Sequence, residues 1–213
     1  MKKNNKGMSI IEIVCVLVIL TSGIIGTYGI INAGNKLEVG TENKIKAINI
    51  AREGIEAVQN IRDTNWIKLS SDYTNCWNTK DYDATCIGNS SFGNFYSGSY
   101  TLINDGFKWY LSGTLANGEN YSSGTYRNKF TVYIDGNGLT YQTGTLIPLP
   151  PLCDSFLSTN CRTLFTRQIN ITPVTGTSQK IKVESIVQWS DIGKTEPYTV
   201  KLETILTNRK NDL

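Results

Sequence analysis

The stretch KGMSIIEIVCVLVIL, residues 6–20, opens an apolar run that continues to Ile31. Between Ser9 and Ile31 the one charged residue is Glu12, and the other polar residues are small or weakly polar. As a helix, a run of this length spans about 30 Å of hydrocarbon. We therefore expect a membrane-spanning helix with one carboxylate that is costly to place in lipid.

The residues before the run set its expected orientation. Lys2, Lys3 and Lys6 account for the whole net charge of +3, and basic flanks stay in the cytoplasm. We expect a single-pass protein of the inner (cytoplasmic) membrane, with a cytoplasmic N-terminus and an extracytoplasmic remainder. A secretory signal peptide is the alternative, but it has an apolar stretch of about 7–15 residues and a small-residue cleavage site. This run is longer, and its end, GIINAGN, matches that site poorly.

The order of residues around Glu12 is specific. Gly7 ends the basic leader, and Glu12 follows five residues later, after MSII. This segment resembles the class III leader of type IV pilins and pseudopilins, with Met8 where phenylalanine is more usual. The resemblance implies that a prepilin peptidase cleaves between Gly7 and Met8 and methylates the new amino terminus of Met8. It also implies filament assembly with other pilin or pseudopilin subunits.

The chemistry of the leader fits these implied steps. Gly7 has no side chain, so a protease can approach its backbone closely. Cleavage would place a positive amino group within a helical turn of Glu12, or near Glu12 of a neighbouring subunit. Among packed apolar helices, that pair would neutralise two charges that are each costly alone, and Glu12 would set the register of the subunit. The alternative is that Glu12 only reaches toward the lipid headgroups.

A second helical pattern follows the apolar run. From Lys36 to about Asn65, apolar residues recur at spacings of three and four, which predicts an amphipathic helix. The expected apolar face consists of Ile45, Ile48, Ala51, Ile55, Val58 and Ile61 or Arg62, opposite Lys44, Arg52, Glu56 and Gln59. The phrase IAREGIEAVQNIRDTNW is similar to the helix end of minor, PilV-like pilin subunits. The glycines at 23, 26, 29 and 34 leave local unwinding of the first helix open.

The rest of the chain reads as β-structure. SYTLI and FKWYLSG suggest short strands in a turn-rich region, residues 70–128, and three later segments alternate cleanly. These are LFTRQINI (Phe165, Ile169 and Ile171 on one face), KIKVESIVQW (Ile181, Val183, Val187, Trp189) and PYTVKLETIL (Tyr198, Val200, Leu202, Leu206). The expected fold is α+β, pilin-like, with a long N-terminal helix packed on an antiparallel sheet. Its parts are a leader (1–7), a transmembrane and polymerisation helix (8–35), an amphipathic helix (36–65) and a β-rich head (66–213).

Four of the five cysteines form two near pairs, Cys76 with Cys86 and Cys153 with Cys161. In an exported head, disulfides are favoured, and local pairing is the economical choice among three connectivities. A metal site is the competing interpretation, but the spacings are not C-x₂-C and the chain has no histidine. Free thiols remain an alternative in a host without an oxidising pathway. The fifth, Cys15, lies in the apolar run as a small apolar residue.

Composition argues against several other functions. Without histidine, Ser/His/Asp and Cys/His catalysis are excluded, and no other catalytic constellation stands out, so an enzyme is not expected. From Gly7 onward, 18 basic residues balance 18 acidic ones, which gives no general footprint for nucleic acid. Asp135 and Asn137 in IDGNGL are candidate calcium ligands, but a hairpin turn is the simpler interpretation. The tryptophans and tyrosines fit a core and rim better than a stacking platform.

The sequence therefore predicts a minor pilin or pseudopilin of a type IV pilus-like or type II secretion-like filament. Its expected partners are the prepilin peptidase, other subunits and the membrane, with no cofactor and no clear nucleic-acid or small-molecule partner. The alternative is a permanently anchored extracytoplasmic binding protein or adhesin, whose helix never leaves the bilayer.

Overall fold

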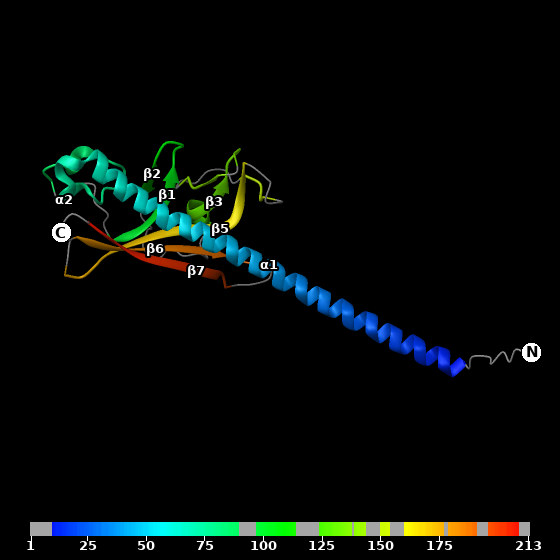
Figure 1. Ribbon diagram of the computed structural model, residues 1–213. Coiled ribbons are helices and arrows are strands. Elements are labelled where there is room, and N and C mark those ends of the chain that lie inside the picture. The colour runs from blue at the N-terminus through cyan, green and yellow to red at the C-terminus, as the bar shows by residue number, and fades with distance from the viewer. Residues whose placement is uncertain are drawn as a thin grey trace, which may run out of the picture. The chain divides into compact units, whose positions relative to one another are not determined.

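A computed structural model describes residues 10–89, 97–113, 124–137, 139–143, 150–153, 160–176, 179–190 and 196–208. Within them, the chain forms two compact units, one up to Ile45 and one from Lys46 onward. Figure 1 shows a long helix and an antiparallel sheet. The leader residues, Gly7 and Met8 included, lie outside the described part.

Helix α1 (Ile10–Lys68, 59 residues) contributes to both units (Figure 1). It runs without a break through Gly23, Gly26 and Gly29, and it ends three residues after the predicted Asn65. Short helical turns follow, η1 (Ser70–Asp72), α2 (Tyr73–Cys76) and η2 (Ala84–Cys86). The predicted membrane helix and amphipathic helix are thus one continuous helix.

In the described part of the chain the sheet has seven strands, and every pairing between them is antiparallel. The strands are β1 (Gly98–Asn104), β2 (Trp109–Ser112), β3 (Thr131–Ile134), β4 (Thr140–Tyr141), β5 (Cys161–Pro173), β6 (Lys180–Trp189) and β7 (Tyr198–Thr207). Long β5 is central: β6 lies on one side, and β1 and β3 share the other. β2, β4 and β7 lie outside β1, β3 and β6. The predicted α+β class and the β5–β6–β7 meander are confirmed.

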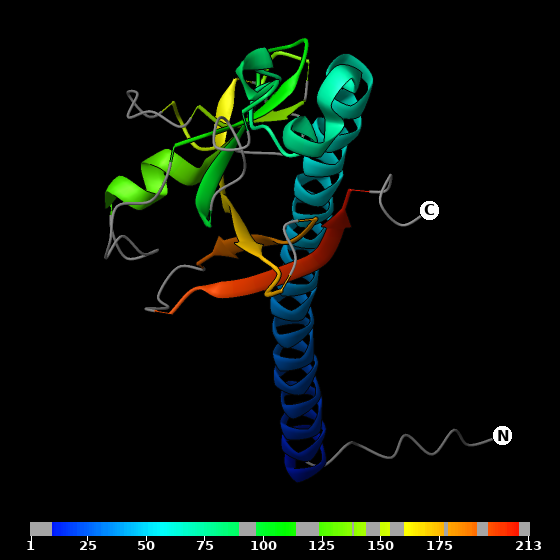
Figure 2. The same cartoon turned by 90° about the vertical axis from the view of Figure 1, so that its left-hand side faces the viewer.

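The predicted alternation of the meander is confirmed in β5 and β6 but only partly in the outer strand β7, where Tyr198, predicted to face inward, is 38% exposed. In β5 and β6, the predicted inward residues are buried, among them Ile169, Ile171 and Val183 at 1% exposure or less. In β7, which pairs only with β6 among the described strands, Val200 and Leu202 are half-buried against the core. Figure 2 shows β7 crossing α1.

The part of α1 from Lys46 to Lys68 packs on the sheet through small residues. Its buried stripe consists of Ala47, Ile50, Ala51, Gly54, Ala57, Val58, Ile61, Arg62 and Asn65. The predicted face was therefore partly wrong: Ile45 is 55% exposed, and Ile48 and Ile55 are only half-buried. At Gly54 an added Cβ would lie 2.4 Å from Ser185 Oγ and 3.0 Å from Ile169 Cδ1. The helix approaches the sheet so closely that small side chains take the central positions.

The helices after α1 were not predicted, and α3 is the longest of those described. Helix α3 (Gly124–Phe130) lies at the end of a region in which only strands and turns were predicted. Its sequence, GTYRNKF, contains few good helix formers. Burial of Tyr126 and Phe130, one turn apart and stacked with 4.7 Å between ring centroids, stabilises it instead. Tertiary packing has overridden local propensity here.

Candidate functional site

The first unit presents an apolar helical surface. Every residue from Ile10 to Glu42 is exposed, including aliphatic side chains such as Ile10 (82%), Ile19 (72%) and Ile30 (76%). An 18-residue window of α1 has a mean hydropathy of 2.4, and none of it is buried. The helix is thus long and apolar enough to cross a membrane, as a single-pass protein requires.

The serine and threonine hydroxyl groups at positions 21, 22 and 27 of this surface are satisfied within the helix. Thr21 Oγ1 donates to the Leu17 carbonyl at 2.8 Å, Ser22 Oγ to Ile19 at 2.8 Å, and Thr27 Oγ1 to Gly23 at 2.8 Å. Such bonds remove the need for water around these side chains, as in helices that lie in lipid. Glu12 is left as the one charged side chain between Ile10 and Ile31.

Glu12 lies in the first described turn of α1. Two residues are predicted to act with Glu12: Gly7 at the cleavage point and Met8 as the methylated terminus. Both lie outside the described residues, so their position relative to Glu12 stays a prediction. A spacing of four residues between Met8 and Glu12 would put both on one face of a continued helix.

The two predicted disulfides are present with local pairing. Cys76 joins Cys86, and Cys153 joins Cys161. The first bridge is buried with Leu69 in a small core cluster at the end of α1. The carboxylate of Asp72 accepts hydrogen bonds from the Gly88 N–H at 2.8 Å and from the side-chain amide of Asn75 at 2.9 Å, and these bonds lower its pKa. They tie the disulfide loop to the residues that follow the helix.

A buried polar network joins α1 to the sheet, and sequence reasoning missed it. Arg167 of β5 is fully buried; its Nη1 lies 3.2 Å from Glu53 Oε1, and its Nε donates to Gln142 Oε1 at 3.0 Å. Thr140 Oγ1 donates to Glu53 at 2.6 Å. Burial lowers the pKa of Arg167, and the Glu53 charge opposes that change. A signal was present, because Arg167 shares the apolar face with Phe165 and Ile169.

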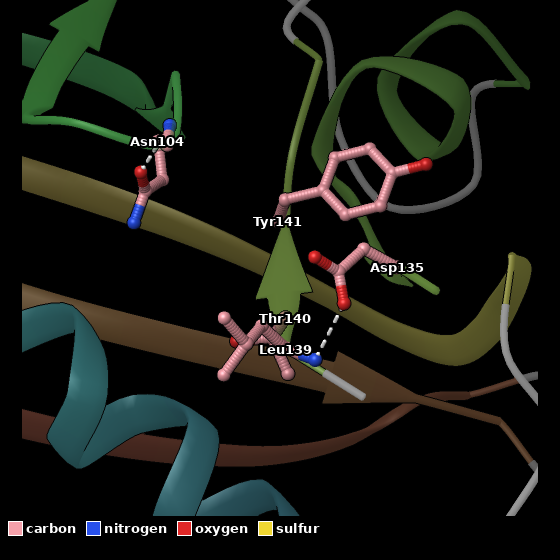
Figure 3. Close-up of a pocket in the computed structure, with 6 residues that line it drawn as sticks. Asn104, Asp135, Leu139, Thr140 and Tyr141 are labelled. Atoms are coloured by element: carbon pink, nitrogen blue, oxygen red, sulfur yellow. Dashed lines mark hydrogen bonds between the residues drawn. The ribbon is translucent and has the colours of Figure 1, made fainter. Parts of the chain in front are cut away.

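The turn containing Asp135 borders a pocket of about 300 Å³, shown in Figure 3. Asp135 Oδ1 accepts hydrogen bonds from the N–H groups of Asn137 and Leu139, both at 2.8 Å. The Asp135 N–H in turn donates to the Leu139 carbonyl at 2.9 Å. These bonds support the hairpin-turn interpretation of IDGNGL. No group of three or more acidic or cysteine side chains that could hold a metal ion occurs in the described residues.

The tryptophans pack in or against the core, as the core-and-rim interpretation predicted. Trp77 and Trp189 are 1% and 4% exposed, and Trp66 and Trp109 pack on the main core cluster. None of the four forms an open stacking platform, and the buried pair contributes to stability through its large apolar area.

Comparison with known proteins gave no match to any family model, curated protein or solved structure. Function is therefore inferred from the chemistry of this chain.

Proposed function

We propose that this protein is a filament subunit, a minor pilin or pseudopilin of a type IV pilus-like or type II secretion-like assembly. The observation that carries the proposal is the unburied apolar surface of α1 with Glu12 as its one charge between Ile10 and Ile31. Such a surface needs lipid before assembly and neighbouring helices after it. The α+β head, with a helix packed on an antiparallel meander, is consistent with this proposal.

In the proposed mechanism, a prepilin peptidase cleaves after Gly7 on the cytoplasmic face and methylates the amine of Met8. The subunit then leaves the inner membrane, and α1 packs among the helices of other subunits. The Met8 amine pairs with Glu12, of the same or a neighbouring subunit, so that neither charge stays unpaired in an apolar setting. Assembly, not catalysis, is the activity.

The head is proposed to lie outside the cytoplasm. Two features support this orientation. The three lysines of the leader favour a cytoplasmic N-terminus. The two disulfides favour an extracytoplasmic head, because disulfides form and persist in oxidising compartments. The head would first face the extracytoplasmic side of the membrane and then the surface of an extracellular or periplasmic filament.

Mass spectrometry of the mature N-terminus tests the proposal. The full chain is expressed in cells with an active prepilin peptidase and in matched cells without it. We expect a chain that starts at methylated Met8 in the first and an intact leader in the second. An intact Met1 start in both would contradict the proposal and support the alternative, a permanently anchored extracytoplasmic binding protein or adhesin.

A further inference from the structure

A second pocket, of about 370 Å³, lies in the β-rich unit. Its walls come from α3, the first half of β5, and the single residues Thr131 of β3, Leu152 and Ser190. Both described charged residues of the lining are arginines, Arg127 of α3 and Arg162 of β5, and no described lining residue is acidic. The described part of the lining is therefore positive, although the chain from Gly7 onward is neutral.

The two arginines differ from the paired arginines elsewhere in the unit. Arg62 lies 2.7 Å from Asp63, and Arg167 lies 3.2 Å from Glu53. Arg127 is exposed and Arg162 is half-buried, and neither guanidinium has an acidic partner in the described part of the chain. The Nε of Arg162 is buried and makes no hydrogen bond there. A buried N–H without an acceptor is costly, because it has lost water without gaining a partner, and this applies to the Nε of Arg162.

A second donor lies next to Arg162. Tyr133 of β3 is its register partner in β5, and the Tyr133 hydroxyl is buried without a hydrogen bond among the described residues. Burial raises the pKa of Tyr133, and the Arg162 charge acts in the opposite direction. The Tyr133 hydroxyl is thus a second buried donor on the strand next to Arg162, although Tyr133 is not one of the described residues that line the pocket.

We propose that this pocket binds a small molecule through an oxyanion, a carboxylate or phosphate group, held by Arg127 and Arg162. Guanidinium groups recognise such oxygens with paired, charge-assisted hydrogen bonds. Leu152 and Leu164, 49% and 37% exposed, line the same pocket and would contact an apolar part of the ligand. The proposal is independent of the filament role, because every residue it uses lies in the second unit.

The test uses the full chain in a non-ionic detergent. Inorganic phosphate and sodium glucuronate are titrated separately at constant ionic strength with chloride, and binding is followed by calorimetry and by the thermal unfolding midpoint. A saturable response to phosphate identifies a phosphate ligand, and one to glucuronate a carboxylate. A lack of saturable response to both overturns the proposal.

Two variants and a control locate the site. Arg162→Gln and Arg127→Gln are each expected to weaken binding at least tenfold; Arg127 is exposed, so its variant keeps the fold even if Arg162→Gln does not. Arg52→Gln, an exposed arginine of α1 outside the pocket, should bind as the wild type does. Binding unchanged in Arg127→Gln, or lost equally in Arg52→Gln, would show that these arginines do not form the site.

Discussion

The two halves of α1 have the same secondary structure and opposite surroundings. In the first half, bulky aliphatic side chains such as Ile11 and Ile25 are 72% exposed. In the second half, Ala47, Ala51 and Val58 are fully buried against the sheet. The first half carries large apolar groups that the described chain does not cover, whereas the second carries small groups that let the sheet come close.

This contrast assigns different roles to the two halves of α1: the first half serves assembly, and the second half serves the stability of the head. Burial of apolar area is favourable by about 25 cal/mol per Å², so the first half gains stability only from lipid or other chains. The second half is already packed by its own sheet. Substitutions before Ile45 should therefore change membrane association or assembly, and those after Lys46 should change the stability of the head.

The largest expected effect is that of Glu12→Ala. Loss of one partner of a buried ion pair costs about 3–5 kcal/mol, so incorporation into filaments should fall by roughly 100-fold or more. Leader cleavage and the unfolding midpoint of the head should stay unchanged. The ratio of assembled to membrane-bound subunit, measured after filament shearing, reports the effect.

The matched control for Glu12 is Glu38→Ala, because Glu38 is also an exposed acid in the first half of α1. It should assemble like the wild type. Undiminished incorporation of Glu12→Ala would remove the role proposed for this carboxylate, and equal loss in both variants would mean that any acid here matters.

Gly54→Leu tests the second half of the helix. Its Cβ would lie 2.4 Å from Ser185 Oγ and 3.2 Å from Arg167 Cδ, so overpacking should cost about 3 kcal/mol. Denaturant unfolding, followed by fluorescence of the buried Trp77 and Trp189, measures the loss. Gly40→Ala is the control in the first half, where an added Cβ meets nothing within 4 Å. It should leave the free energy of unfolding of the head unchanged. Equal losses of stability in the two variants would contradict the proposed difference between the two halves of α1.

Removal of the disulfides should have a somewhat smaller effect on the head. Each loop is short, with sequence separations of 10 and 8, and loop closure of this size contributes about 2.5 kcal/mol. Replacement of Cys76 and Cys86 by alanine should cost more than replacement of Cys153 and Cys161, because the first bridge is fully buried with Leu69. Denaturant midpoints of the two double variants compare them, and the reverse order would contradict this explanation.

The smallest expected effect comes from Glu184 on β6. Hydrogen bonds from Lys182 and Lys201, each at 2.7 Å, lower the pKa of Glu184 from its usual 4.5. The folded state therefore gains stability above about pH 4.5 and loses it as the pH falls through the folded pKa. Glu184→Gln should reduce stability by less than about 1 kcal/mol at pH 7, and by less again as the pH falls below about 4.5.

A pH series of unfolding midpoints measures this difference. Glu203→Gln is the control, since Glu203 lies farther from both lysines, at 3.4 Å, and is 56% exposed. An equal loss at pH 2 and pH 7 in Glu184→Gln would show that packing, not charge, is responsible.

Prediction from sequence succeeded where a pattern is long and local. The alternation in β5 and β6 identified Ile169 and Val183 as core residues, and the spacing of the cysteines indicated the local pairs that the structure contains. It was partly wrong for the helix face, because Ile45 and Ile48 fit the spacing of three and four but lie beside the buried stripe. The true stripe depends on how near the sheet lies, which no local pattern encodes.

The candidate sites divide in the same way. Glu12 stands out in the sequence, because a charge in an apolar run is a local anomaly. The Arg127 and Arg162 pocket does not, since its residues lie 35 positions apart and are ordinary in their own segments. The Arg167 network is an intermediate case. The strand alternation places Arg167 on the apolar face of β5, but it does not identify Glu53 as its partner.

By itself, the sequence determined the long helix, its apolar first half with Glu12, the strand alternation and the α+β class. These depend on composition and on periods of 3.6 and 2 residues, which each segment carries alone. Only the tertiary structure decided which side of α1 meets the sheet, where α3 forms, and which charges are paired. Those outcomes depend on distances between segments far apart in the chain, and close packing sets these distances.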